Sequence, residues 1–175
     1  MKELLIIGGS PFVNKVNLTA LDFNYYDVLG INNPPLNIPC HYVLGVDDIH
    51  PVTAPKTELI TKSNGYKFVH TGHSDLAERT LCYRYYSSSA SVDFACLKGY
   101  KVAYLIGVDL KETTEPFDHW HGVKNTSHMH IEALQDEKKA IYKYYNKMKI
   151  YQCNPDVANE WQIPYFDVKD LKTKS

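Results

Sequence analysis

Four of the chain's eight histidines lie close together, in the segment HWHGVKNTSHMH at 119–130. Imidazole titrates near neutral pH, so this segment could supply a general base, a general acid or ligands for a metal ion. A metal site needs three or four converging donors, which Asp118 and these histidines could provide. Their spacing matches no metal signature such as H-E-x-x-H, and a single histidine acting as a base requires less coincidence. A solvated loop explains at least two of the four.

A second segment that could do chemistry is Gly8-Gly9-Ser10-Pro11. Glycines at the end of a strand let backbone amides approach a phosphate, and the start of a helix adds a favourable dipole. The segment is neither G-x-G-x-x-G nor a Walker A sequence, because no Lys-Ser/Thr pair follows it. On its own it indicates a tight turn between a strand and a helix.

A third segment, Arg84-Tyr-Tyr-Ser87-Ser88-Ser89, precedes a helical pattern. Serine hydroxyls at the start of a helix cap its free amides. The same geometry could hold a carboxylate or a phosphate, with the Arg84 guanidinium as a bidentate partner. The residues alone favour neither interpretation.

Six short apolar runs must position these segments. They are rich in β-branched residues and do not alternate with polar ones, which is typical of strands buried on both faces of a parallel sheet. The predicted strands are 3–7, 27–31, 42–46, 67–70, 101–107 and 149–152.

Apolar residues at helical spacing predict helices at 88–98, with Gly99 as the stop, and at 130–147. In the second helix, the charged residues 136–139 mark the face opposite the apolar one. Strands and helices in alternation imply an α/β fold. We therefore predict a single Rossmann-like domain over 1–168, with a mostly parallel sheet flanked by helices, and a frayed tail over 169–175.

Polar residues follow several predicted strands, at the edge where open parallel sheets bind their ligands. They are Gly8-Gly9-Ser10-Pro11, Asn32-Asn33, Asp47-Asp48, and Asp109 with the loop through Ser127. Any one of these segments is explained by turn formation, since Asn, Asp and Gly favour turns. Four of them together favour a binding site.

Composition narrows the class of protein. The chain has 175 residues, of which 44% are hydrophobic, enough for one folded core. Its 19 basic and 20 acidic side chains argue against sequence-independent binding of nucleic acid, which normally needs a basic surplus. The cysteines at 40, 82, 96 and 153 form no C-x-x-C pair, which indicates reduced thiols. The N-terminus lacks a signal-peptide pattern, and no stretch reaches the roughly 18 apolar residues of a membrane span, so we expect a cytoplasmic protein.

Two stretches resemble the bacterial sialyltransferases of the Campylobacter type, which are glycosyltransferases that use CMP-sialic acid. The stretches are RYYSSSASVDFACLKGYKVAYLIGVDL at 84–110 and HIEALQDEKKAIYKYYNKMKIYQCNP at 130–155. In that family an Arg-x-x-Ser-Gly segment precedes a helix, a Gly-Tyr-Lys turn and a strand ending in Gly-Ile-Asp. Arg84, Ser87, Gly99-Tyr100-Lys101 and Gly107-Val108-Asp109 fall at the same spacing. IIGGSPF looks like a rearranged form of the Gly-Asn-Gly-Pro-Ser turn of related proteins, some of them phage-borne.

The resemblance implies a glycosyltransferase A-like variant of the fold. It also implies a nucleotide-sugar donor, most simply a CMP-sugar and otherwise a UDP-sugar, with no metal and no other cofactor. The residues that it places around the donor or the acceptor are Gly8, Gly9, Ser10, Asn32, Arg84, Ser87, Ser88, Asp109, Lys111 and Asn154.

The family's catalytic histidine lies in a His-Ser-Lys-Asn-Thr-like stretch that precedes a helix. HGVKNT, which begins with His121, resembles this stretch, and His128 is nearer the predicted helix. The resemblance implies that one of the two deprotonates an acceptor hydroxyl, which attacks the anomeric carbon as CMP leaves.

The chain also departs from the family pattern. The family steadies the leaving phosphate with two tyrosines, and LKETTEPFDHW at 110–120 contains none, with Lys111 in place of the first. Ser88 replaces a glycine, and the chain is shorter in the middle and in the lid region. A catalytically degraded nucleotide- or sugar-binding module and a metal-dependent hydrolase built on the histidines therefore stay open. The expected partners are a nucleotide sugar and a sugar-type acceptor, and tyrosines near 142–145 could serve a homo-oligomer interface.

Overall fold

The computed structural model describes residues 2–31, 37–45, 67–70, 77–79, 87–109, 117–118, 124–125 and 131–174. Seven of its strands form one sheet in which every neighbouring pair is parallel. They are β1 (Glu3–Ile7), β2 (Tyr26–Ile31), β3 (Tyr42–Gly45), β4 (Lys67–His70), β5 (Ala77–Arg79), β6 (Val102–Ile106) and β9 (Lys149–Gln152), in the spatial order β5-β4-β3-β2-β1-β6-β9. β7 (Phe117–Asp118) and β8 (Lys124–Asn125) form a separate antiparallel pair.

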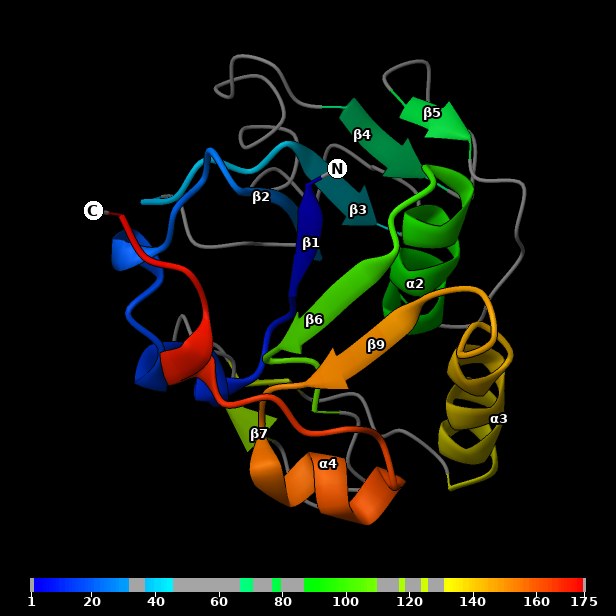
Figure 1. The fold of residues 1–175 in the computed structure, drawn as a ribbon. Helices are drawn as coiled ribbons and strands as arrows, with labels where there is room; N and C mark the ends of the chain where they lie inside the picture. Colours follow the sequence, from blue (N-terminus) through cyan, green and yellow to red (C-terminus); the bar gives the residue numbers. More distant parts are fainter. Residues whose placement is uncertain are drawn as a thin grey trace.

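Three helices pack with one face of the sheet (Figure 1). They are α2 (Ser87–Leu97), α3 (Ile131–Tyr142) and α4 (Pro155–Trp161). Leu4, Ile6 and Leu105 point from β1 and β6 into the core on this side, and Trp161 of α4 is buried in the same cluster. Because successive strand residues point to opposite faces, Leu5, Ile7 and Ile106 enter a second core on the other side.

The second face of the sheet is covered by short 3₁₀ helices and by the C-terminal segment. The 3₁₀ helices are Pro11–Lys15, Leu18–Ala20 and Val168–Asp170. In Figure 1 the C-terminal segment, drawn in red, runs beside the first two of them, drawn in blue. Leu21 and Thr173 form an antiparallel bridge, and the Lys174 amide donates to the Ala20 carbonyl over 2.9 Å.

The predicted α/β class, with one mostly parallel sheet, is confirmed, and all six predicted strands are present with ends shifted by at most one residue. The sequence interpretation missed β5, β7, β8 and α4. Strands of two or three residues are too short to show a period. α4 carried a readable signal, because Asn154 caps its first turn and Pro155 follows at the first helical position.

Three expectations need correction. α3 ends at Tyr142 rather than at Lys147, and residues 143–147 form turns. Glu137, expected on the solvent face of that helix, is 1% exposed because it contacts the start of α2. The tail is not frayed as far as Lys174, because Leu171 is 3% exposed and the backbone on either side of it is hydrogen-bonded.

No helix in the described part of the chain is both long enough and apolar enough to cross a membrane. Three of the four cysteines lie in that part and are free thiols: Cys40 and Cys153 are buried, and Cys96 is half-buried. Burial raises the pKa of the Cys153 thiol to about 12, so this thiol stays protonated and unreactive at neutral pH.

Candidate functional site

The candidate site lies where the chain reverses its direction of travel across the sheet. From β1 the chain moves outward through β2, β3, β4 and β5, and then returns to place β6 on the other side of β1. Because β1 and β6 are adjacent and parallel, the segments that follow them, Gly8–Ser10 and Gly107–Asp109, leave the sheet side by side at its carboxyl edge. Ligands of open α/β sheets bind at such a switch point, so the topology selects these two segments.

Gly8 lets the two segments approach each other. Its amide donates to the Ile106 carbonyl over 2.8 Å, and the Ser10 amide donates to the Gly107 carbonyl over 3.0 Å. A Cβ atom on Gly8 would lie 2.3 Å from the Gly107 oxygen, so any side chain at this position would force the backbone to shift. The sequence suggested that these amides could approach a phosphate. In the structure the amides of Gly8 and Ser10 instead donate hydrogen bonds to carbonyl groups at the end of β6.

Three side chains meet at this point: Ser10, Asp109 and Asn154. The Ser10 hydroxyl donates to Asp109 Oδ2 and accepts from the Phe12 amide over 3.1 Å. Asn154 Nδ2 donates to the same Oδ2 over 2.8 Å. One carboxylate oxygen thus joins the segments that follow β1, β6 and β9, and the sequence had selected all three residues from separate parts of the chain.

The other oxygen of Asp109, Oδ1, is buried and has no hydrogen-bond partner among the described residues. A buried carboxylate oxygen that accepts nothing is costly, because it has lost its water without a replacement. A ligand hydroxyl or amino group would satisfy it. The charge also determines which part of a ligand could lie there, because a phosphate beside Asp109 would be repelled.

Gln152, which the sequence interpretation missed, holds two of these segments together. It is fully buried at the end of β9, where its Nε2 donates to the Val108 carbonyl over 2.9 Å. Its Oε1 accepts from the Asn154 amide over 3.1 Å. Gln152 therefore fixes the residue before Asp109 relative to Asn154. An uncharged polar residue closing an apolar strand was the only signal for it in the sequence.

Ser88 has an internal partner. Its hydroxyl donates to Glu137 Oε1 over 2.5 Å, while the Ser89 amide and hydroxyl donate to the same carboxylate over 2.7 and 2.8 Å. The start of α2 is thus capped by a carboxylate from α3. Both serine hydroxyls donate to this carboxylate, so the segment holds a carboxylate that the chain itself supplies, and a role in ligand binding stays a prediction.

Most of the remaining predicted residues lie outside the part of the chain that the structure describes. Asn32, Arg84, Lys111, His121 and His128 lie outside the described residues, as do Asp47 and Asp48. Ser87 begins α2 and Gly9 lies in the turn between Gly8 and Ser10. Within the described ranges, no three His, Cys, Asp or Glu side chains are grouped so that they could hold a metal ion.

Solved structures with the same arrangement of elements are known. The sialyltransferase CstII from Campylobacter jejuni, in complex with the substrate analogue CMP-3FNeuAc, aligns over 100% of this chain and 89% of its own, with a TM-score of 0.62 and 16% identity. The α-2,3-sialyltransferase Cst-I from the same organism aligns over 99% of this chain and 83% of its own, with a TM-score of 0.64 and 15% identity.

This chain has the fold of the Campylobacter sialyltransferases. The resemblance stated from the motifs is thereby confirmed at the level of the fold. The Maf glycosyltransferase from Magnetospirillum magneticum AMB-1 is also similar, with a TM-score of 0.64 and 13% identity, over 99% of this chain and 35% of its own. No protein-family model and no curated protein sequence matches the chain.

Proposed function

We propose that this protein is a glycosyltransferase that binds a nucleotide sugar at the cluster of Ser10, Asp109 and Asn154. A CMP-sugar is the donor that we favour, and the acceptor is a hydroxyl group of a second sugar. The observation that carries the proposal is the buried Oδ1 of Asp109 at the switch point, which has no hydrogen-bond partner in the described part of the chain. Solved structures with this fold include CstII in complex with CMP and with a trisaccharide acceptor, which supports both substrate classes.

In this proposal Asp109 recognises the nucleoside end of the donor. A carboxylate at the carboxyl edge of a parallel sheet is suited to accept hydrogen bonds from ribose hydroxyls. Ser10 and Asn154 saturate Oδ2. Oδ1 is left for the ligand, and the phosphate lies away from the Asp109 charge.

The proposed reaction is a direct displacement that uses no metal ion. His121 or His128 accepts the proton of the acceptor hydroxyl. The acceptor oxygen then forms a bond to the anomeric carbon, and the bond from that carbon to the phosphate oxygen breaks. CMP leaves with the electron pair. Lys111 is proposed to balance the phosphate charge, in the place that a tyrosine takes in the family.

Calorimetric titration with CMP tests the binding step. We expect wild type to bind CMP more tightly than GMP, and Asp109→Asn to lose about 10- to 100-fold in affinity, because the amide removes an acceptor and places N–H groups against Ser10 or Asn154. Asp136→Asn, on an exposed carboxylate of α3, is the matched control. Equal affinities of Asp109→Asn and wild type would overturn the proposed site.

Turnover of CMP-sugars tests the base. Exchange of the true base for alanine should lower kcat by about 100-fold or more and leave CMP affinity unchanged. Activity that survives both His121→Ala and His128→Ala would refute the histidine mechanism. CMP binding without turnover of any CMP- or UDP-sugar would instead identify a nucleotide-binding module.

A further inference from the structure

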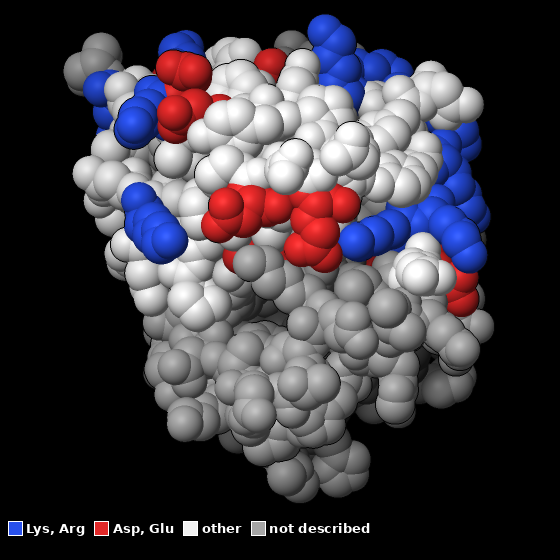
Figure 2. Space-filling model, turned by 90° about the horizontal axis from the view of Figure 1, so that it is seen from below, with Lys and Arg blue, Asp and Glu red and all other residues white. Residues whose placement is uncertain are grey.

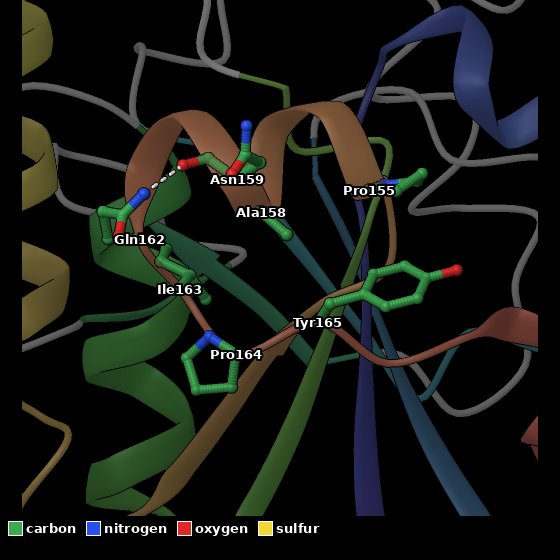
Figure 3. Close-up of a pocket in the computed structure, with 7 residues that line it drawn as sticks. All are labelled: Pro155, Ala158, Asn159, Gln162, Ile163, Pro164 and Tyr165. Atoms are coloured by element: carbon green, nitrogen blue, oxygen red, sulfur yellow. Dashed lines mark hydrogen bonds between the residues drawn. The ribbon is translucent and has the colours of Figure 1, made fainter.

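A pocket of about 550 Å³ lies on the flank of α4, the helix that Asn154 caps (Figure 3). Pro155, Ala158 and Asn159 line it from α4, and Gln162 to Tyr165 line it from the segment that follows. This volume is in the range of small-ligand sites, though the pocket is open rather than enclosed. None of the residues discussed for nucleotide binding lines it.

Tyr165 is the only aromatic residue among the described residues that line the pocket. It is 47% exposed, and its ring lies along the flank of α4 between Pro155 and Pro164 (Figure 3). The backbone beneath it is fixed, because the Gln152 amide donates to the Pro164 carbonyl over 2.9 Å and the Phe166 amide donates to the Gln152 carbonyl over 3.1 Å. Because tyrosine has only two side-chain torsions and its backbone is fixed here, the ring loses little entropy when a ligand stacks on it.

Amide side chains supply the polar groups of the pocket. Asn159 and Gln162 are both exposed, and Gln162 Nε2 donates to the Asn159 carbonyl over 2.6 Å, which orients the Gln162 side chain across the end of α4 (Figure 3). A primary amide offers both a donor and an acceptor, so it can pair with hydroxyl groups in either direction.

The pocket offers an anion no charged partner among its described residues. None of its described lining residues is charged. Of the two carboxylates of α4, Glu160 pairs with Lys138 over 3.5 Å, and Asp156 lies in the first turn. Figure 2, which shows the molecule from below, shows acidic side chains across the middle of the view with basic ones beside them. The lining therefore suits a neutral ligand better than a phosphate-bearing one, to which it gives no cation.

We propose that this pocket binds a neutral sugar ring of the acceptor, as a subsite beyond the sugar that is modified. A sugar ring has an apolar face of C–H groups that can stack on Tyr165 and an edge of hydroxyls that can pair with Asn159 and Gln162. Gln152 links the backbone of the two sites, because it pairs with the backbone around Tyr165 and contacts Val108 and Asn154. The proposal rests on the proposed transferase function. It adds that the acceptor contains at least two sugars and that the sugar bound in this pocket is neutral.

Protein NMR tests this subsite without requiring turnover. Neutral di- to tetrasaccharides, namely lactose, maltose, chitobiose and their longer homologues, are titrated into the full chain while backbone amide shifts are followed. We expect shifts at Ala158, Ile163 and Tyr165. Tyr165→Ala should lose them, whereas Tyr165→Phe, which keeps the ring, should retain them. Leu97→Ala removes another exposed apolar side chain, 54% exposed at the end of α2, and is the matched control.

CMP titration of the same variants separates this inference from the proposed function. Tyr165→Ala should bind CMP as wild type does, which also shows that it folds. If CMP binds and no saccharide shifts these amides, the subsite is refuted and the nucleotide site stands. If saccharides shift them equally in Tyr165→Ala, the subsite is also refuted. Saccharide shifts without any CMP binding would support the pocket and overturn the nucleotide site.

Discussion

At the scale of single residues, Gly8 and Gly99 are glycines for different reasons. Gly8 is needed because a Cβ would lie 2.3 Å from the Gly107 oxygen, and Gly99 because its φ is +83° with open space around it. We expect Gly8→Ala to lower the free energy of unfolding by about 3 kcal/mol or more, since backbone must move, and Gly99→Ala by only about 1–2 kcal/mol. Urea denaturation of both variants measures the difference, and equal costs would contradict the close approach of β1 and β6.

His41 makes stability depend on pH. Its Nδ1 accepts from the Val28 amide over 3.0 Å, and its own amide donates to the Val28 carbonyl over 2.8 Å, so the side chain extends the pairing of β2 and β3. Burial lowers the pKa of His41, opposed by the nearby Asp27 carboxylate and reinforced by the Lys2 ammonium. The neutral form is therefore the one that the folded protein favours.

The sign of the pH effect follows from this direction. The unfolded chain binds a proton at His41 below about pH 6.5 while the folded protein resists it, so stability is present above that pH and is lost as the pH falls below it. We expect the stability advantage of wild type over His41→Gln, measured by urea unfolding, to shrink between about pH 7.5 and about pH 5.5. Parallel pH profiles of the two proteins would rule this role out.

At the scale of elements, the packing of α2 on α3 depends on Glu137. The carboxylate is buried and accepts from the Ser88 hydroxyl and from the amide and hydroxyl of Ser89. We expect Glu137→Ala to cost about 3 kcal/mol, because it leaves the donors at the start of α2 without a partner. Glu137→Gln should cost less, since its amide oxygen can still accept. Thermal unfolding with Asp136→Ala as control checks this, and similar costs at 136 and 137 would contradict it.

The sequence predicted strands better than it predicted the polar contacts between elements. Continuous apolar runs such as Leu4–Ile7 indicate buried strands because they are short, rich in branched residues and followed by glycine or another turn residue. Glu137, by contrast, stands among charged residues at helical spacing, and nothing local distinguishes a buried carboxylate from its solvated neighbours. Its partner lies 48 positions away at Ser89, so burial was decided by tertiary packing.

The same contrast holds for the candidate site. Ser10 and Asp109 were selectable because each follows a predicted strand, and parallel strands bring their carboxyl ends to one edge, whereas Asn154 was named only by the family resemblance. That they share a single oxygen was not predictable, because it depends on how closely the two segments at Gly8 and Gly107 approach. Gln152 was missed for a related reason: its function is to join segments that are distant in sequence.

At the scale of the whole molecule, the two faces of the sheet are built differently. Helices cover one face, and thin segments from both ends of the chain cover the other. Aromatic rings strengthen the thin layer: the centroid of Tyr104 lies 5.6 Å from that of Tyr151 and 4.8 Å from that of Phe166. The Lys172 amide donates to the Tyr26 hydroxyl over 2.9 Å, which ties the C-terminal segment to the start of β2.

This arrangement makes the C-terminal segment part of the core. Leu171 is 3% exposed in the cluster that also contains Leu5, Ile7 and Tyr26. We expect Leu171→Ala to lower the free energy of unfolding by about 2–4 kcal/mol through the cavity it leaves, while Lys169→Ala, on an exposed side chain, changes it by less than about 0.5 kcal/mol. CMP affinity should be equal in both variants, because the C-terminal segment contacts Gln152, next to the candidate site, through Phe166, which neither substitution changes. Equal stability of the two variants would contradict this and support the sequence prediction that residues 169–175 are frayed.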